Sequence, residues 1–424
     1  MRLRSSERRL GSDFAKFWTG QTISQLGTSF TLFALPLLVF KLTGSAVNLA
    51  ITTASEMVPY LLFGLVIGAL ADRLNRKRMM IAVDLLRAAV IATIPVLAII
   101  GRLNVWWIYG VGFVATTLTI FFESGQFAAI PSLVGGEDLV GANGKIQASF
   151  PAAAVAGPLL AGLLITKMPI YDVIWVDVGS FVVSAIALAT IGKGFNAEEQ
   201  RERTTIRADI KEGLSYVLKH PVLRNISAMM AIINLLSVTV FAQIVLFSKE
   251  RLAATDSEVG YLFAAGSLGV VILALAAGPL RKRFAFSTVA LSALIADGLA
   301  IVALAFTRSY WIALPLWAVS SGLGILFNIN TGSLRQAIVP GHMLGRVISI
   351  AAVLAWSAQP LGSLAGGYVI KWTGNVAAVY ATIGGSVALV ALAFWLFSPL
   401  GRAEDYLVKL PGPATETEPS PVQI

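Results

Sequence analysis

The stretch GALADRLNRKRMM, residues 68–80, stands between two long apolar runs and carries four basic residues beside a single acid. Gly68 and the alanine after it would let the backbone approach a neighbouring helix closely. Asp72 falls near the start of the next helix, where negative charge is favoured, and it can pair with Arg76 or Arg78. The stretch therefore indicates either a plain basic loop at a membrane surface or a polar cluster that fastens helices together.

The composition of the whole chain favours a membrane setting for this stretch. Of 424 residues, 56% are hydrophobic and only 13% are charged, whereas soluble domains carry about 25% charged residues. The absence of cysteine excludes disulfides, thiolate catalysis and cysteine metal sites. Only His220 and His342 could supply imidazole, and both stand beside helix-boundary residues. The sequence predicts an all-α polytopic membrane protein without a metal, a cofactor or catalytic residues.

Twelve apolar runs are long enough to cross a bilayer, since a spanning helix needs about 20 predominantly apolar residues. The first run is not followed by a signal-peptide cleavage site, so we expect it to be retained. The expected spans are about 14–40, 46–71, 79–101, 105–127, 146–166, 171–192, 222–247, 257–280, 285–306, 310–333, 346–371 and 375–398.

The basic residues between these runs predict the orientation of the chain. With a cytoplasmic N-terminus, 24 of the 32 Lys and Arg fall on the cytoplasmic side and seven on the other, with Arg87 inside a span. This bias predicts a multi-pass protein of the cell (inner) membrane with both termini in the cytoplasm. Because topology accounts for the net charge of +9, we expect the lipid bilayer and no nucleic acid as a partner.

The chain divides into two nearly equal parts around its longest polar stretch. AVAGPLLAG (154–162) and QPLGSLAGG (359–367) occupy matching places in the two parts, which indicates an internal repeat of six helices. Two such halves fit a secondary transporter with a site at the midplane. The expected organisation is a basic N-terminus (1–13), an N-terminal six-helix bundle (14–192), a cytoplasmic linker (193–221), a C-terminal six-helix bundle (222–398) and a disordered cytoplasmic tail (399–424).

Placed after the second of twelve spans, residues 68–80 resemble the G-x-L-a-D-r-x-x-r-k-r signature of the major facilitator superfamily. The resemblance implies a cytoplasmic latch that holds the outward-facing state and breaks when the two halves rock. The family pattern commonly adds an acid at the inner end of span four, and two residues of span three can pair on one helix face. The expected latch residues are Gly68, Asp72, Arg73, Arg76, Arg78, Asp84, Arg87 and Glu123.

The segment AVAGPLLAG in span five is similar to the G-x-x-x-G-P-x-x-G-G antiporter motif of that superfamily, with alanine at the first and ninth positions. Gly157 and Gly162 open the helix face, while Pro158 removes a backbone hydrogen bond and bends the helix. Glycine and proline are also simply frequent in membrane helices. If the resemblance holds, the motif implies export rather than uptake.

Five further segments resemble one branch of the superfamily, the drug:proton antiporters that include macrolide-efflux proteins and enterobactin-type siderophore exporters. Two departures from that branch leave its proton-handling residue open, since 105–127 contains no Arg or Lys and 14–40 contains no acid. The resembling segments are LPLLVFKLTGS (35–45), ADRLNRKR (71–78), AIPSLV and GAN (129–143), VDVGSF (176–181) and GRVIS (345–349).

Acids inside the spans are candidates for proton coupling, because a charge at the bilayer centre costs about 2.5–3.5 kcal/mol on insertion scales. Glu56, Glu123 and Asp297 are the candidates, with Glu56 favoured by its central position. A protonated Glu56 bonded to a neighbouring helix is the competing interpretation. Asp177 and Asp297 fall on spans that the family places at the outside of the bundle, where pairing with serine or backbone groups is expected.

Polar residues near the midplane could form the substrate cavity. A cavity of amides, hydroxyls and an aromatic ring with little charge would suit a bulky amphipathic solute, although such residues equally often hold helix to helix by hydrogen bonds. The candidates are Gln21, Gln25, Thr28, Asn234, Ser237, Trp356 and Gln359.

These observations predict a monomeric exporter of a drug-like or secondary-metabolite solute by proton antiport, with protons and a small-molecule substrate as partners. An uptake symporter or facilitator on the same fold is the alternative, and it differs only in direction. A membrane-embedded enzyme would need a His/Asp or Ser/His constellation at one membrane depth, which the sequence does not offer. An ATP-driven pump is disfavoured because GANGKI (141–146) lacks the glycine and the Ser/Thr of a P-loop.

Overall fold

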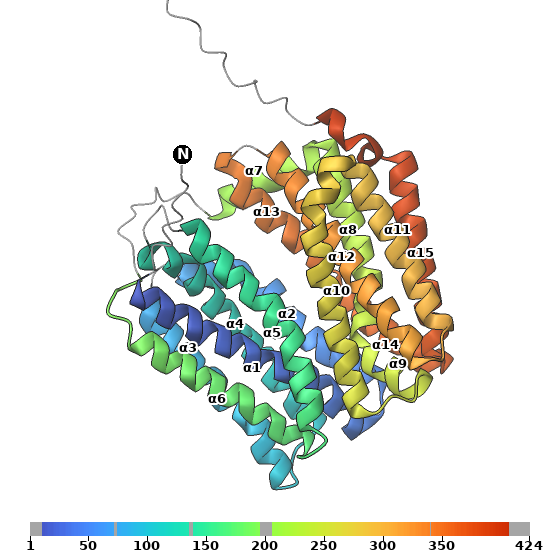
Figure 1. Cartoon of the computed structure of the whole chain (residues 1–424). Coiled ribbons are helices and arrows are strands. Elements are labelled where there is room, and N and C mark those ends of the chain that lie inside the picture. The colour runs from blue at the N-terminus through green and yellow to red at the C-terminus, as the bar shows by residue number, and fades with distance from the viewer. Residues whose placement is uncertain (1–10, 72–73, 135–138, 196–205, 340, 407–424) are drawn as a thin grey trace, which may run out of the picture.

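The computed structural model describes residues 11–71, 74–134, 139–195, 206–339 and 341–406, which form helices joined by short loops (Figure 1). In chain order the elements are α1 (Ser12–Thr43), α2 (Ala46–Ala71), α3 (Arg76–Ile99), α4 (Val105–Leu133), α5 (Leu139–Leu164), α6 (Ile170–Ala189), α7 (Ile206–Lys219), α8 (Pro221–Ala242), α9 (Ile244–Arg251), α10 (Asp256–Arg283), α11 (Phe286–Phe306), α12 (Tyr310–Ile338), α13 (Gly341–Trp356), α14 (Gln359–Thr373), α15 (Val376–Phe397) and the 3₁₀ segment Pro399–Tyr406.

The all-α membrane fold is confirmed. Within the described ranges, ten helices are long and apolar enough to cross a membrane. The other two expected spans fall on α5, whose apolar part 148–164 is shorter, and on α13 and α14, which share one span. Twelve spans are therefore consistent with the structure.

Side-chain caps fix where several helices begin. Asn75 accepts a hydrogen bond from the backbone N–H of Arg78 and so starts α3 directly after the basic stretch. Thr255 and Glu258 form a reciprocal capping box at the start of α10. Such caps satisfy backbone N–H groups that have no partner inside the helix. They place Asp256 in the first turn of α10, where the helix dipole favours a negative charge.

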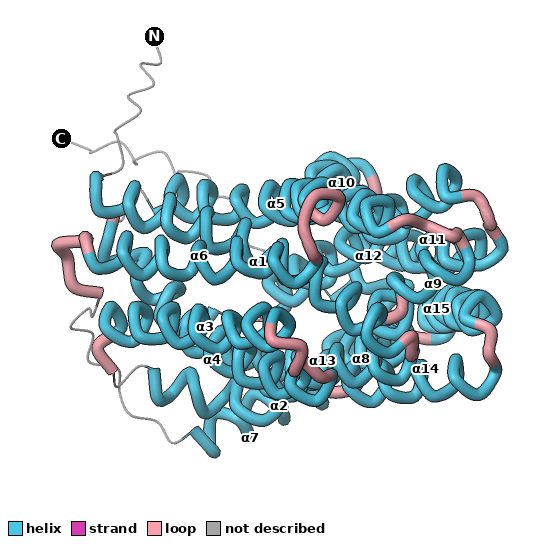
Figure 2. The backbone as a smooth tube through the Cα atoms, turned by 90° about the horizontal axis from the view of Figure 1, so that it is seen from below, coloured by secondary structure: helices cyan, strands magenta, loops and turns pink. Residues whose placement is uncertain are grey.

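The helices form two groups, α1 to α6 and α8 to α15, that lie side by side (Figures 1 and 2). The groups touch through α2 against α14 and through α5 against α10. In Figure 1 they converge at the bottom, where α1 ends and α10 begins, and diverge toward α7 at the top. We call these the Lys41 end and the linker end.

Two predicted spans are broken, the seventh near its end and the eleventh near its middle. The seventh breaks at Gln243, between α8 and α9, and the eleventh breaks at residues 357–358, between α13 and α14. The Gln243 side chain is fully buried and donates from Nε2 to the carbonyl of Ala46 on α2, at 2.7 Å. Ser363 on α14 donates to the carbonyl of Ala50, at 2.9 Å. These bonds tie the two groups together at the Lys41 end.

The segment after α15 differs from the disordered tail that the sequence predicts. Pro399–Tyr406 is a 3₁₀ segment in which Leu400 and Ala403 are buried. Glu404 accepts hydrogen bonds from the backbone N–H and the hydroxyl of Ser287 at the start of α11, at 3.0 and 3.2 Å. Apolar burial and this cap order the first eight residues; the rest of the tail lies outside the described residues.

His220 has the helix-boundary role expected of it. Its Nδ1 accepts a hydrogen bond from the backbone N–H of Leu223 and so caps the start of α8. Burial beside the rings of Tyr216 and Tyr406 lowers the pKa of His220. Its surroundings are those of a structural residue.

Candidate functional site

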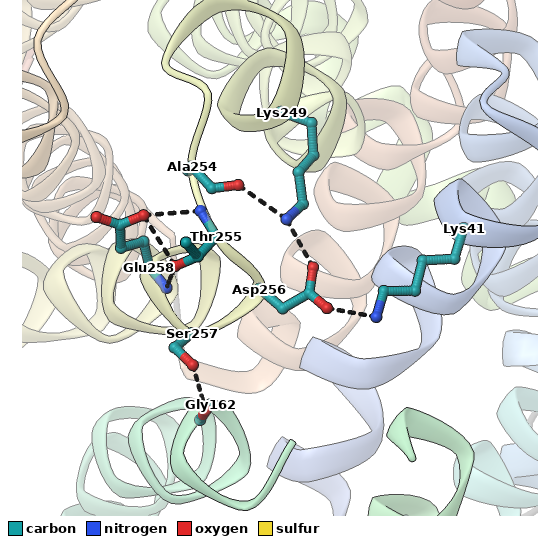
Figure 3. Close-up of polar contacts among 8 residues, drawn as sticks. All are labelled: Lys41, Gly162, Lys249, Ala254, Thr255, Asp256, Ser257 and Glu258. Atoms are coloured by element: carbon teal, nitrogen blue, oxygen red, sulfur yellow. Dashed lines mark hydrogen bonds and ion pairs between the residues drawn. The ribbon is translucent and has the colours of Figure 1, made fainter. Parts of the chain in front are cut away.

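A three-residue ion cluster joins the two helix groups at the Lys41 end (Figure 3). Asp256 in the first turn of α10 pairs with Lys41 near the end of α1. It also pairs with Lys249 on α9, where Nζ lies 2.6 Å from Oδ1. Lys249 donates as well to the carbonyl of Ala254, at 2.8 Å. One carboxylate therefore holds a lysine from each group, and we call this set the Lys41–Asp256–Lys249 cluster.

The segment that resembles the antiporter motif lies beside this cluster and makes close contacts that need its small residues. A Cβ on Gly157 would lie 2.3 Å from the Cβ of Ser29 on α1. Farther along α5, the carbonyl of Gly162 accepts a hydrogen bond from the hydroxyl of Ser257 on α10, at 2.9 Å (Figure 3). A Cβ on Gly260 would lie 2.8 Å from the carbonyl oxygen of Pro158. The segment therefore forms part of the contact between the two groups.

Asp84 and Arg87 pair as their spacing in the sequence predicts. The pair, 3.5 Å apart, is buried two turns inside α3. The guanidinium carbon of Arg87 lies 4.1 Å from the ring centre of Phe181 on α6 and 5.5 Å from that of Phe122 on α4. Because aromatic faces attract cations, these rings hold Arg87 inside the first group.

Asp177 on α6 has the structural surroundings expected for it. Its carboxylate is 1% exposed and accepts hydrogen bonds from Thr31, at 2.6 Å, and Thr28, at 3.3 Å, both on α1. Gln21 on α1 likewise donates to Ser184 on α6, at 3.1 Å. Two residues expected in the substrate cavity, Gln21 and Thr28, therefore bind helix to helix. Gln25 and Gln21 both line a hollow of about 10 Å³.

Glu123 is an exposed acid close to the end of the apolar span Val105–Gln126. It stands ten residues before the end of α4, and the hydroxyl of Tyr60 on α2 lies 3.4 Å from both of its carboxylate oxygens. Glu56 is half-buried on α2 and faces α4, where a Cβ on Gly112 would lie 3.5 Å from its Cγ. Of these two candidates for proton coupling, Glu123 is the more exposed.

The basic stretch itself is only partly described. Asp72 and Arg73 lie outside the described residues, and Gly68 lies in α2. The guanidinium of Arg76 donates to the carbonyl of Phe195, at 3.4 Å, whereas Arg78 is exposed. This hydrogen bond of Arg76 therefore joins two parts of the first group.

Asp297 lines a cavity of about 450 Å³ formed by α8, α10, α11 and α12. Its Oδ1 accepts a hydrogen bond from the hydroxyl of Ser320, at 2.5 Å, which is the serine pairing expected for it. Ser237 lines the same cavity, as predicted for a substrate residue. Asn234 instead donates to the carbonyl of Ala355, at 2.9 Å, and so binds α8 to α13.

Trp356 and Gln359 stand on either side of the break in the eleventh span. Trp356 is the last residue of α13 and is 52% exposed, and Gln359 is the first residue of α14. Within the ranges that the structure describes, no group of three His, Asp or Glu residues is placed to hold a metal ion.

Sequence reasoning missed the residues that act through partners distant in the chain. The charge pattern identifies Lys41 only as one of the basic residues between the spans, and nothing in the sequence singles out Asp256, although both stand at span ends where pairing is possible. Tyr60 and the cavity aromatics Phe263 and Trp317 read as ordinary membrane-helix residues. Only their spatial neighbours distinguish them, and a single sequence carries no signal for those.

Comparisons with known proteins place the chain in a family. A family model described as transmembrane secretion effector matches residues 11–413. The multidrug efflux pump Tap of Mycolicibacterium fortuitum is 29% identical over 355 residues, covering 80% of this chain and 85% of that protein. Macrolide efflux protein A of Streptococcus pyogenes is 27% identical over 357 residues, covering 82% and 87%.

The fold has a counterpart among solved structures. A variant of the nucleoside transporter NupG superposes with a TM-score of 0.78 at 11% identity, covering 91% of this chain and 99% of that one. The family model and the relatives are transporters, which sets aside the alternative of a membrane-embedded enzyme. The resemblance that begins with residues 68–80 is confirmed: the chain is a multi-pass membrane transporter that belongs to the transmembrane secretion effector family of the major facilitator superfamily.

Proposed function

We propose that this transporter exports drug-like, amphipathic solutes in exchange for protons, by alternating access between the two helix groups. Its relatives are named as multidrug and macrolide efflux proteins, which favours export of large organic solutes over uptake of a small metabolite. In this proposal the linker end faces the cytoplasm, residues 14–192 and 222–398 are the two moving bundles, and the protein works as a monomer.

The observation that carries the proposal is the one-sided contact between the groups. At the Lys41 end they are joined by the Lys41–Asp256–Lys249 cluster, by Ser257 with Gly162, and by Gln243 with Ala46. Toward the linker end the helices of the two groups diverge (Figure 1). A transporter closed toward one side of the membrane and open toward the other has this distribution of contacts. Breaking the cluster would let the Lys41 end open.

Glu123 supplies the coupling in this proposal. Glu123 is an exposed residue with the Tyr60 hydroxyl beside its carboxylate, and in this proposal it takes up a proton from water that enters from the linker end. An acid in this position is a functional candidate, because burying its charge in the membrane is costly. One proton moved through 100 mV contributes about 2.3 kcal/mol, and tenfold accumulation of solute costs about 1.4 kcal/mol.

The alternative, uptake of a solute, differs from export only in the direction of transport. It uses the same helices and would reverse only the coupling, so the segment 154–162 and the relatives are what favour export. A transport assay in vesicles of known orientation decides between the two directions.

The test uses everted membrane vesicles that are energised to make the lumen acidic, with a pH-sensitive dye as the readout. Cationic amphiphiles, macrolides and catecholate siderophores are added in turn to vesicles with and without the transporter. We expect one class to dissipate the gradient in wild-type vesicles. Glu123→Gln should abolish this response while the protein remains in the membrane.

The parallel variant Glu56→Gln locates the coupling residue. If Glu123→Gln responds normally and Glu56→Gln does not, the assignment to Glu123 is wrong and coupling moves to Glu56. Proton exchange is contradicted if no solute dissipates the proton gradient and wild-type vesicles still accumulate a solute when no proton gradient is present.

A further inference from the structure

The cavity at Asp297 lies within the second group, next to the boundary with the first. It is lined by residues of α8, α10, α11 and α12. Phe241, which is 55% exposed, packs edge-to-face on Phe263 with ring centres 6.2 Å apart. Phe263 packs in turn on Phe33 of α1, at 5.9 Å. The aromatic edge of the cavity therefore reaches the first group, where a transported solute would pass.

The chemistry of the lining is apolar and aromatic with one acid. Phe241, Phe263 and Trp317 contribute aromatic surface, and Asp297 is the single charged residue among the described residues of the lining. Serine, glycine, aliphatic residues and one asparagine make up the remainder. Pockets for drug-sized ligands have volumes of about 300–1,000 Å³, mostly apolar walls and a few placed polar groups. The cavity of about 450 Å³ has each of these properties.

The polar groups of the cavity retain bonding capacity. Oδ1 of Asp297 is held by Ser320, whereas Oδ2 has no hydrogen-bond partner among the described residues. The hydroxyl of Ser237 is likewise buried without a partner in the part of the chain that the structure describes. A carboxylate fixed through one oxygen and free at the other, with aromatic rings around it, is complementary to an organic cation, because both the charge and the ring faces attract it.

We propose that this cavity binds the cationic part of an amphipathic aromatic substrate, with Asp297 as the counter-ion and the three aromatic residues as the walls. The inference deepens the proposed export function by naming its substrate class, organic cations. Asp297 acts here as a binding residue for the solute, and proton transfer stays with Glu123.

Glycines in α12 provide a clean way to test the cavity. A Cβ on Gly324, which lines the cavity, would meet nothing within 4 Å, so a leucine there fills the space without a backbone clash. A Cβ on Gly332, farther along the same helix and away from the cavity, also meets nothing within 4 Å. Gly332→Leu is therefore the matched control for Gly324→Leu. Asp297→Asn keeps an oxygen that can accept from Ser320 and removes only the charge.

The experiment measures equilibrium binding to purified full-length protein, with no ion gradient and no transport. Its probes are tetraphenylphosphonium and tetraphenylborate, which share one shape and carry opposite charges. We expect the wild type to bind the phosphonium and to discriminate against the borate. Both Asp297→Asn and Gly324→Leu should raise the Kd for the phosphonium at least tenfold, or about 1.4 kcal/mol, and Gly332→Leu should leave it within twofold.

Several results would overturn the proposal. Phosphonium affinity that is equal in the wild type, Asp297→Asn and Gly324→Leu would place the binding elsewhere. Preference for the cation that persists in Asp297→Asn would remove the counter-ion role, and absence of phosphonium binding to the wild type would remove the substrate class. Since binding is measured without a gradient, each of these results leaves the vesicle test of proton-coupled export unaffected.

Discussion

The buried acids of the two helix groups occupy different surroundings. In the first group, Asp84 lies against Arg87, and Asp177 accepts from two threonines of α1. Both carboxylates are almost fully buried, and the oxygens of Asp84, which have no hydrogen-bond partner among the described residues, are compensated by the charge of Arg87. In the second group, Asp297 has a single serine partner and borders a cavity of about 450 Å³.

The difference separates two uses of a charge inside a membrane protein. A carboxylate whose partners are all protein groups contributes to stability, because removing a partner leaves an uncompensated charge. A carboxylate beside empty space contributes little to packing and can meet a ligand. We therefore expect substitutions in the first group to affect mainly the free energy of unfolding, and substitutions around Asp297 to affect mainly binding.

The largest expected effect is that of Arg87→Met. Asp84 would remain fully buried without its counter-charge, and breaking one partner of a buried pair costs about 3–5 kcal/mol. Thermal unfolding of the purified protein measures it, and Arg78→Met, at an exposed residue, is the control. Equal unfolding temperatures for Arg87→Met and the wild type would contradict the structural role of the pair.

The next effect comes from ligand binding at the second group. Tetraphenylphosphonium at 100 times its Kd should stabilise the folded protein by about 2.7 kcal/mol. The same stabilisation should appear in Thr31→Val, whose change lies in the first group, and should shrink in Gly324→Leu at a single fixed concentration. If the ligand stabilised Gly324→Leu as much as the wild type, the ligand would not bind at the Asp297 cavity of the second group.

Asp177→Asn and Asp297→Asn compare the two acids directly. Hydrogen bonds to a charged group contribute about 1.5–3 kcal/mol, so we expect Asp177→Asn to lower the free energy of unfolding by about 2 kcal/mol. Asp297→Asn, with one serine partner and free space beside it, should cost less than about 1 kcal/mol. Chemical unfolding in one detergent measures both, and a reversed order would refute the comparison.

The smallest effect distinguishes the two threonines that bind Asp177. Thr31→Val removes the bond of 2.6 Å to this charged group and should cost about 1.5 kcal/mol, while Thr28→Val removes the longer bond of 3.3 Å and should cost less. Valine keeps the shape of threonine in both cases. If Thr28→Val were the more damaging change, Thr28 would have a role beyond this bond, such as the cavity role first predicted for it.

The sequence predicts features that depend on local pattern. Apolar runs of spanning length gave the helices, and the stretch at 68–80 with the segment 154–162 gave the family. The pairing of Asp84 with Arg87 also followed from their spacing of three residues, because such neighbours share a helix face.

Features that depend on distant contacts were beyond the sequence. The spacing of Asp84 and Arg87 could not reveal that Phe181, far along the chain, holds the arginine inside the first group. Polar residues on one helix face could line a cavity or bind a neighbouring helix. Thr28 binds Asp177 on a neighbouring helix, whereas Ser237 lines the cavity. The helix face is encoded locally, whereas the neighbour that meets it is set by the packing of the whole fold.

Phe263 belongs both to the wall of the Asp297 cavity and, through Phe33, to the contact between the groups. Three residues before it on α10, Gly260 packs against Pro158 and Phe33. A solute that shifts Phe263 thereby changes the free energy of the interface, and linkage makes this coupling reciprocal. If an occupied cavity weakens closure at the Lys41 end by some factor, loosening that closure must raise solute affinity by the same factor. Lys41→Ala, although remote from the cavity, would then raise the affinity of the cavity for its solute.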